Sequence, residues 1–191
     1  TIPHDPKLDL ANYTASVWLK SIKSNESGDG WVGVFGRPGR HYAFWQGNGN
    51  TDSWFVHHRF KWGNVTNQGA PNTGGFSHGV WTHVALTNNA STAATYVNGT
   101  LRTSGGSGTL QYGPSDLHIG ANPDNGSSLW YEGLMDDLRF YDVALSATEV
   151  ANLYNGGYGD QFTIPATITS PATAEATVGQ AFSYQITTTG S

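Results

Sequence analysis

A run of eight residues, 134–141, alternates strictly between two kinds of position. One set is Leu134, Asp136, Leu138 and Phe140, and the other is Met135, Asp137, Arg139 and Tyr141. Period-two spacing is the signature of a β-strand, because successive side chains of a strand point to opposite faces. Since both sets contain hydrophobic residues, the pattern predicts a strand that neighbouring elements largely cover.

Asp136 is the anomaly in this strand, because its predicted face is otherwise hydrophobic. A carboxylate that is taken out of water needs a cation or several hydrogen-bond donors. Two interpretations therefore stand side by side. The oxygens of Asp136 accept hydrogen bonds from backbone N–H groups of a neighbouring loop, or they bind Ca²⁺, a cation that prefers oxygen ligands.

A short helix is predicted after this strand. Ser146 and Glu149 have the spacing of a capping box, in which each side chain accepts a hydrogen bond from the other residue's backbone N–H. The helix spans residues 147–154 and places Val150 and Leu153 on one apolar face. A single docked helix at this point is the expectation.

The preceding chain repeats the strand pattern. Alternating or short apolar segments between turn residues predict strands at 13–20, 31–36, 41–46, 53–62, 80–87 and 116–120, and a hairpin at 93–102. The hairpin turns at Asn98 and Gly99, a pair favoured by type I′ turns. Residues 64–79 are the longest stretch predicted to be irregular. With 25 Gly and only 12% charged residues, the composition fits many strands joined by turns, so the predicted class is all-β.

Several of these segments resemble one known family. Gly133–Tyr141, together with Ser146, Glu149 and Tyr154, is similar to the C-terminal signature of bacterial laminin G-like domains of the concanavalin A-like lectin/glucanase superfamily. The strand at 80–87 resembles the family's central strand. The resemblance implies an antiparallel jelly-roll β-sandwich over residues 1–158, with one short C-terminal helix.

The composition changes to Thr, Ala, Ser and Pro after residue 159. Residues 162–186 resemble the first strands of bacterial immunoglobulin-like or cadherin-like repeats. About thirty residues are too few for such a sandwich. We therefore expect residues 159–191 to be a linker and the first strands of a truncated immunoglobulin-like domain. This implies a longer, secreted, multidomain parent protein, whose neighbouring domains are expected partners.

The resemblance also implies a structural calcium ion. Related glucanases place one between the N-terminal segment, a turn-rich loop and the Asp of the last strand. The corresponding ligands in this chain are Asp136 and a backbone carbonyl near Asp29 or Gly30.

Charge and hydropathy exclude two classes of partner. The formal net charge is −5 and the nine Lys and Arg are scattered, so no basic patch is available to neutralise several phosphates. The chain also lacks a run of about 18 apolar residues that would span a membrane. Neither nucleic acid nor a membrane is an expected partner.

The carboxylates argue against catalysis. Glycoside hydrolysis needs two carboxylates at a fixed separation. The chain has only four Glu, at 26, 132, 149 and 175, and no two carboxylates alternate on one predicted strand. A non-catalytic module is therefore the expectation, with a glycan-active enzyme as the weaker reading.

Aromatic residues supply the positive case for binding. Sugar rings stack on Trp and Tyr, and polar neighbours bond to the hydroxyl groups. The candidate ligand-binding residues are Trp45, Trp54, Trp62, Trp130, His57 and Arg59. Ordinary packing within a sandwich is the competing interpretation for each tryptophan. Trp81 and His83 also share a face, and for them a core Trp with a hydrogen-bonded His is favoured.

These observations predict an extracellular module that binds a polysaccharide or a cell-surface glycan. The loops at 47–52, 64–79 and 122–128 are expected to rim its site, because recognition usually lies on loops held by a rigid sheet. The alternative is a structural or adhesive spacer that binds protein or no ligand.

Overall fold

The structure is a computed structural model, and it describes residues 1–22, 31–39, 41–47, 54–59, 66–70, 79–89, 91–106, 113–157, 167–168 and 188–189. The chain divides into two compact units, Thr1–Gly159 and Asp160–Ser191. In the second unit, β11 (Thr167–Ile168) pairs with β12 (Thr188–Thr189) in an antiparallel sense. The immunoglobulin-like identity of this unit stays a prediction.

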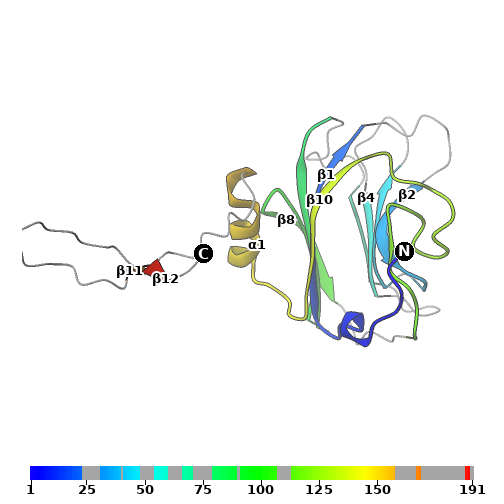
Figure 1. Cartoon of the computed structure of the whole chain (residues 1–191), viewed down its shortest axis with the longest axis horizontal. Helices are drawn as coiled ribbons and strands as arrows, with labels where there is room; N and C mark the ends of the chain where they lie inside the picture. Colours follow the sequence, from blue (N-terminus) through cyan, green and yellow to red (C-terminus); the bar gives the residue numbers. More distant parts are fainter. Residues whose placement is uncertain are drawn as a thin grey trace, which may run out of the picture. The chain divides into compact units, whose positions relative to one another are not determined.

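The first unit is a sandwich of two antiparallel five-stranded sheets, as the sequence predicted (Figure 1). The first sheet has the order β10-β1-β6-β7-β8, formed by Gly133–Tyr141, Tyr13–Ser21, Thr82–Asn88, Thr92–Val97 and Thr100–Gly106. The second has the order β5-β4-β3-β2-β9, formed by Thr66–Ala70, Trp54–Arg59, His41–Gly47, Trp31–Arg37 and His118–Ile119. Strand β5 lies inside the segment 64–79 that was predicted to be irregular. The sequence analysis missed it because its Asn, Gln and Gly residues show no hydrophobic alternation.

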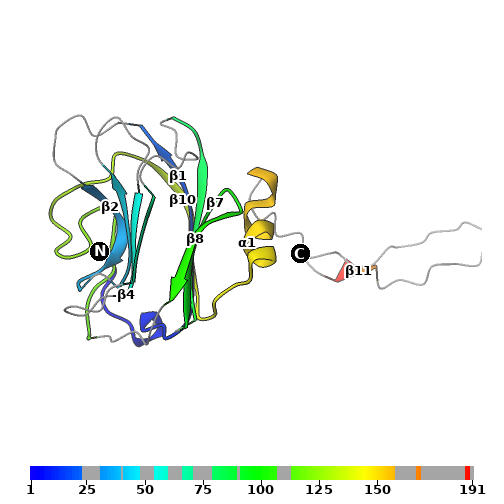
Figure 2. The same ribbon diagram turned by 180° about the vertical axis from the view of Figure 1, so that it is seen from behind.

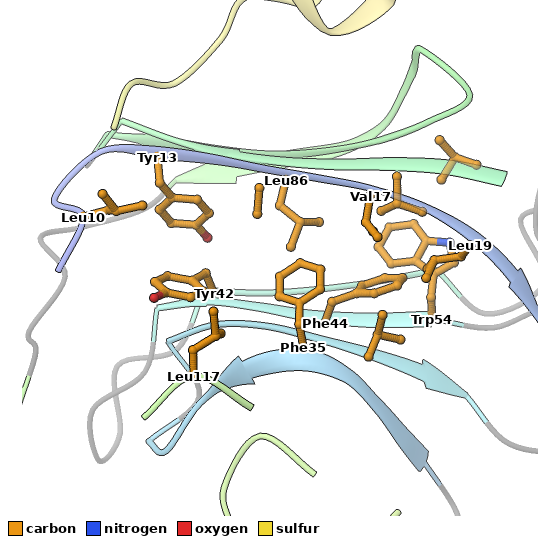
Figure 3. Close-up of a cluster of buried hydrophobic side chains, with 14 residues drawn as sticks. Leu10, Tyr13, Val17, Leu19, Phe35, Tyr42, Phe44, Trp54, Leu86 and Leu117 are labelled. Atoms are coloured by element: carbon orange, nitrogen blue, oxygen red, sulfur yellow. The ribbon is translucent and has the colours of Figure 1, made fainter. Parts of the chain in front are cut away.

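The core lies between the sheets (Figure 3). Four alternating residues of β1 have no exposed surface and face the second sheet, as their spacing predicted: Tyr13, Ala15, Val17 and Leu19. Opposite them, the second sheet contributes Phe35, Tyr42, Phe44 and Trp54. Because these large side chains interdigitate in one contiguous cluster, the two sheets are fixed relative to each other.

Strand β10 departs from the predicted alternation at a β-bulge. Ser16 of β1 pairs with Arg139, but Trp18 pairs with Asp136, so two residues of β10 oppose Val17 alone. Asp137 at the bulge has a left-handed backbone with φ of 52°. The extra residue moves everything before it to the opposite face of the sheet.

The predicted faces of β10 were therefore wrong. Met135, Leu138 and Phe140 pack against the core, whereas Leu134 and Asp136 are exposed on the outer face. Asp136 does not share a face with Leu138 and Phe140. The carboxylate is in contact with water, and no buried charge needs to be explained.

Helix α1 (Ala147–Tyr154) lies on the outer face of the first sheet, as both views of the ribbon show (Figures 1 and 2). Its only fully buried residue, Val150, packs on Ala85, Ala94 and Tyr96 of β6 and β7. The predicted capping box is confirmed: Glu149 N donates to Ser146 Oγ at 3.3 Å, and Ser146 N donates to Glu149 Oε2 at 2.7 Å.

The hairpin between β7 and β8 is also confirmed. Asn98 and Gly99 have φ values of 49° and 70°, which is the left-handed pair that a type I′ turn requires. The Asn98 Oδ1 atom accepts a hydrogen bond from the backbone N–H of His83 at 2.9 Å. This contact ties the turn to strand β6.

A segment between β9 and β10 covers the outer face of the second sheet, on the side away from α1 (Figures 1 and 2). Gly33 of β2 lies directly under it, because a Cβ atom at Gly33 would collide with the carbonyl of Ala121 and would lie 2.7 Å from Cδ of Pro123. The absence of a side chain at this position lets the segment approach the sheet closely.

Candidate functional site

Two of the described tryptophans are buried and three are exposed, while Trp18 is intermediate. Trp54 is 1% exposed in the core and Trp45 is 6% exposed. Trp130, Trp31 and Trp81 are exposed by 59%, 39% and 39%. The three exposed tryptophans are the ones available to a ligand among the residues that the structure describes.

Hydrogen bonds around the end of β1 indicate that these three residues lie at the same end of the sandwich. Ser21, the last residue of β1, donates from Oγ to Gln46 Oε1 of β3 at 2.8 Å. The N–H of Ile22 donates to the carbonyl of Glu132, and the N–H of Gly79 donates to the carbonyl of Ser21. At this end of the sandwich, the end of β1 is therefore hydrogen-bonded to the segments that precede β6 and β10, which carry Trp81 and Trp130.

Gly33 is the centre of an aromatic group on the outer face of the second sheet. It pairs with Trp45 of β3 on one side, and on its other side it forms a parallel bridge with Trp130. The Gly33 N–H donates to the carbonyl of Leu129 at 2.9 Å, which fixes the segment that carries Trp130. Trp31 lies two residues before Gly33 and so shares its face. We call Trp31, Trp45 and Trp130 the tryptophan platform.

Trp45 is the covered member of the platform. Its neighbour Phe44 points into the core, so Trp45 points outward from the same strand. Trp45 is 6% exposed, and its partner on β2, Gly33, lies under the segment that contains Ala121. Trp45 is therefore not accessible, although it was a predicted ligand-binding residue, and Trp31 and Trp130 are the accessible members of the platform.

An ordered polar loop precedes Trp130. Asn122 closes the loop on Ser128 through its backbone N–H, at 2.8 Å from the Ser128 carbonyl, and through its side chain, at 3.1 Å from Ser128 Oγ. Within the loop, Gly126 N donates to the Asn122 carbonyl at 2.7 Å, and Asp124 N donates to Asn122 Oδ1 at 2.9 Å. The geometry is therefore set before any ligand arrives, which lowers the entropic cost of binding.

The predicted ligand-binding residues are divided by the structure. Trp54 is in the core and is not accessible, so the packing interpretation holds for it. Trp130 is the most exposed tryptophan of the described residues. His57 and Arg59 lie in β4, where they pair with Ala43 and Thr66, and their side chains are outside the described part of the structure, as is all of Trp62.

Two exposed tryptophans were not among the predicted site residues. Trp31 begins β2 directly after a polar turn-rich stretch, and this position at the end of a strand was the available signal. Trp81 was assigned to the core with His83, and its exposure of 39% corrects that assignment. Strand β6 begins at Thr82, so Trp81 precedes the part of the strand that α1 and its neighbours cover.

His83 behaves as a core histidine, as expected. Its Nε2 atom lies 2.8 Å from Ser16 Oγ, and its ring lies 5.2 Å from the ring of Trp18. Burial lowers the pKa of His83 to about 4, so the side chain is neutral at pH 7. Tyr154 of α1 stacks on Trp18 at 5.8 Å and helps to cover the pair. His83 is therefore part of the helix docking site and not of the platform.

Asp136 is exposed, so the argument that a buried carboxylate at this position needs a cation no longer applies. Its Oδ1 atom accepts a hydrogen bond from the N–H of Asp137 at 2.8 Å, and Asp137 in turn accepts from Arg139 Nε at 2.6 Å. No three His, Asp or Glu side chains gather into a metal-binding group in the described ranges. The other predicted ligands, Asp29 and Gly30, lie outside those ranges.

Comparison with known proteins places the first unit in a broad group. A family model described as the concanavalin A-like lectin/glucanases superfamily matches residues 1–151. No curated protein sequence matches the chain significantly. In the residues that the structure describes, no helix has the length and apolar character needed to cross a membrane.

Solved structures with the same fold include modules of different origin. The CBM40 module of the Ruminococcus gnavus IT-sialidase, bound to α2,3-sialyllactose, matches with a TM-score of 0.61 at 15% identity, over 78% of this chain and 86% of that one. The heptameric SAP-like pentraxin of Limulus polyphemus matches with a TM-score of 0.58 at 16% identity, over 81% and 72%.

A third similar structure is the receptor-binding domain of the botulinum neurotoxin mosaic serotype C/D, with a TM-score of 0.56 at 17% identity. The match covers 80% of this chain and 38% of that one, so the chain spans little more than a third of the toxin domain. At these identities the comparisons show the fold alone.

Proposed function

Because the chain belongs to the concanavalin A-like lectin/glucanases superfamily, we propose that its first unit is a non-catalytic module that binds carbohydrate through Trp130 and Trp31. The observation that carries the proposal is the exposure of these two residues near Gly33: Trp31 lies two residues before it on β2, and Trp130 forms a bridge with it. Exposed aromatic faces are costly in water and are suited to stacking on the apolar face of a sugar ring.

Polar groups suited to orienting a sugar lie on the loop that directly precedes Trp130 in the chain. The Asn122–Ser128 loop presents side-chain amide and hydroxyl groups, and Asn125 and Ser127 within it are exposed. Such groups bond to sugar hydroxyls and select among their orientations. The CBM40 module in complex with α2,3-sialyllactose gives a carbohydrate-bound example of the same fold.

The proposal includes the absence of catalysis. Hydrolysis of a glycosidic bond needs an acid and a second carboxylate facing each other across a cleft. Asp136 and Asp137 are adjacent in the chain, and Asp137 is paired with Arg139. Glu149 is bonded to Ser146 as a helix cap. None of these three carboxylates is placed for such a pair.

The test is affinity electrophoresis and a glycan array with the whole chain. We expect retention on at least one polysaccharide, and a loss of affinity on the order of tenfold in Trp130→Ala, equivalent to about 1.4 kcal/mol. Trp31→Ala and Trp81→Ala form a matched pair, because both rings are 39% exposed but only Trp31 belongs to the platform. Trp81→Ala should bind as the unmodified protein does.

Two results would contradict this proposal. Binding that survives Trp130→Ala and Trp31→Ala but is lost in Trp81→Ala would move the site to the first sheet. No retention on any glycan, with Ca²⁺ present, would favour the alternative function, a structural or adhesive spacer that binds protein or no ligand.

We propose further that the module acts in a secreted, multidomain protein, beside neighbouring domains, and that it carries a structural calcium ion. The first part is supported by a second compact unit that begins at Asp160. Calcium is supported by the family resemblance alone, since Asp136 is exposed. Melting the protein in CaCl₂ and in EDTA tests the ion directly.

A further inference from the structure

The backbone of Leu129, the residue before Trp130, is left-handed, with φ of 52°. A bulky side chain takes this region against its intrinsic preference. Residues held in such conformations cluster at binding sites, where the strain is part of the arrangement. We propose that Leu129 is a positioning residue, whose left-handed backbone sets the direction of the Trp130 ring. The inference rests on the proposed function, because it names what orients the most exposed ring of that site.

Hydrogen bonds fix the φ angle of Leu129 from both sides. This angle describes rotation about the N–Cα bond, which lies between the carbonyl of Ser128 and that of Leu129. The Ser128 carbonyl accepts the N–H of Asn122 at 2.8 Å, and the Leu129 carbonyl accepts the N–H of Gly33 at 2.9 Å. An extended conformation would rotate one carbonyl relative to the other and break at least one of these bonds. The two bonds together therefore hold Leu129 in the left-handed region.

The peptide group that follows Trp130 is fixed as well. The N–H of Tyr131 donates to the carbonyl of Gly120 at 3.0 Å, and the N–H of Gly120 donates to a carbonyl of β2 at 2.7 Å. The backbone of Trp130 is therefore held on one side by Gly33, through the Leu129 carbonyl, and on the other side by Gly120.

The Trp130 side chain depends on this backbone for its direction. It is 59% exposed, and no hydrogen bond or ring contact holds it among the residues that the structure describes. The next residue, Tyr131, packs against the core instead. Since the Trp130 ring has no such anchor, the torsion angles of the backbone before it decide where it points.

The side chain of Leu129 does not account for the unusual backbone. It is half-buried and belongs to neither hydrophobic cluster of the described residues. Burial in the core therefore does not compensate for the left-handed conformation. The hydrogen bonds that Asn122 and Gly33 donate on either side of the φ angle supply that compensation.

Two substitutions separate the backbone of Leu129 from its side chain. Leu129→Asn removes the apolar side chain but suits the left-handed region, which asparagine adopts readily. Leu129→Val keeps an apolar side chain but opposes that region, because valine is β-branched. Leu101→Val is the matched control, since Leu101 is an exposed residue of β8 without a left-handed backbone.

The first measurement needs no sugar. Fluorine NMR of the whole chain labelled with 5-fluorotryptophan reports the surroundings of each ring, and the Trp130 resonance is the one that Trp130→Phe removes. We expect this resonance to keep its position in Leu129→Asn and Leu101→Val. In Leu129→Val we expect it to shift or split, because the ring loses its fixed direction.

The second measurement is affinity electrophoresis of the whole chain in xylan, arabinan, β-glucan and galactomannan. On any polysaccharide that retards the unmodified protein, we expect Leu129→Val to bind about tenfold more weakly. Leu129→Asn and Leu101→Val should stay within about twofold of the unmodified protein. Leu129→Ala, which opposes the left-handed region less strongly than valine does, replaces Leu129→Val if that variant does not fold.

The outcomes separate this inference from the proposed function. Equal changes in Leu129→Asn and Leu129→Val would assign the effect to the side chain and overturn the inference. An unchanged Trp130 resonance in Leu129→Val would also overturn it, and so would a changed resonance with unchanged affinity. If the unmodified protein binds no polysaccharide, the proposed function is overturned, whereas the resonances still show whether Leu129 sets the direction of Trp130.

Discussion

The guanidinium of Arg37 donates from Nη1 to Oδ1 of Asp9 at 2.7 Å, although Arg37 is fully buried. Arg37 also donates to the carbonyls of Leu8 and Ser115 at 2.9 and 3.1 Å. His4 bonds the second oxygen of Asp9 at 3.1 Å. A single cation in β2 thus holds the N-terminal segment and the segment before β9 against the sheet.

Removing this cation should be strongly destabilising. We expect Arg37→Met to lower the free energy of unfolding by about 3 kcal/mol, because two partly buried carbonyls and one carboxylate lose their donor together. Asp9→Asn should cost less, since Arg37 keeps both carbonyl partners. Urea unfolding of the two variants measures the difference. Equal losses would show that the carbonyl bonds contribute little.

The same pair predicts a response to acid. Burial tends to raise the pKa of Asp9, but hydrogen bonds from Arg37 and His4 outweigh it and hold the pKa below 3.8. As the pH falls, Asp9 is therefore protonated at a higher pH in the unfolded state than in the native state. Stability from this carboxylate is complete above pH 4 and falls as the pH drops further. Asp9→Asn should remove that part of the acid transition, which a melting series from pH 2 to 5 records.

His83 predicts a loss of stability at a higher pH. Burial lowers its native pKa to about 4, against 6.5 for an ordinary histidine. Below pH 6.5 the histidine becomes protonated in the unfolded state but stays neutral in the native state. The stabilising contribution of neutral His83 is therefore complete above pH 6.5 and falls between pH 6.5 and 4. His41 has a similarly lowered pKa of about 4, caused by burial and by the charge of Arg37. We expect His83→Asn to reduce the slope of melting temperature against pH in this range by about half. An unchanged slope would show that other groups cause the pH dependence.

Gly33 should tolerate no side chain. A Cβ atom would collide with the Ala121 carbonyl, so we expect Gly33→Ala to cost about 2 kcal/mol and to loosen the segment that bears Trp130. Gly106→Ala is the control, because no atom of the described residues lies within 4 Å of its Cβ position. Thermal melting compares the two. A neutral Gly33→Ala would contradict the close approach of the Ala121 segment.

Asp136 distinguishes the calcium proposal from an ordinary exposed carboxylate. From its exposure we expect Asp136→Ala to change the free energy of unfolding by less than about 0.5 kcal/mol when no Ca²⁺ is present. If Asp136 is a ligand, EDTA lowers the melting temperature of the unmodified protein but not of the variant. Equal shifts would assign the ion to other ligands, and no shift in either protein would contradict a structural calcium.

Much of the architecture followed from local patterns. The core face of β1, the hairpin at Asn98 and Gly99, and α1 with its capping box all lie where the spacing of residues predicted them. These features depend on interactions between residues that are close in sequence, or on an alternation that continues through one strand. The short strand β5 was missed for the converse reason, since it owes its pairing to β4 and not to its own side chains.

The residues of the candidate site were predicted less accurately from the sequence. Trp130 was predicted and is exposed, but Trp54 was predicted and is buried, and Trp31 was not considered. All three have the same side chain in a strand or beside one, so their own residue type does not distinguish them. What distinguishes them is that the first sheet covers Trp54, whereas Trp31 lies at the end of a strand.

The sequence by itself therefore determined the fold class, most of the strands and the single helix, because periodicity, turn residues and caps act over a few residues. Only the tertiary structure decided which face each side chain occupies and whether anything covers it. One extra residue at Asp137 moved Asp136 from the predicted dry face to water. The missing side chain at Gly33 allowed a segment distant in sequence to approach β2 closely, and that segment carries the exposed Trp130. Exposure is a property of segments far apart in the chain, and no local pattern specifies it.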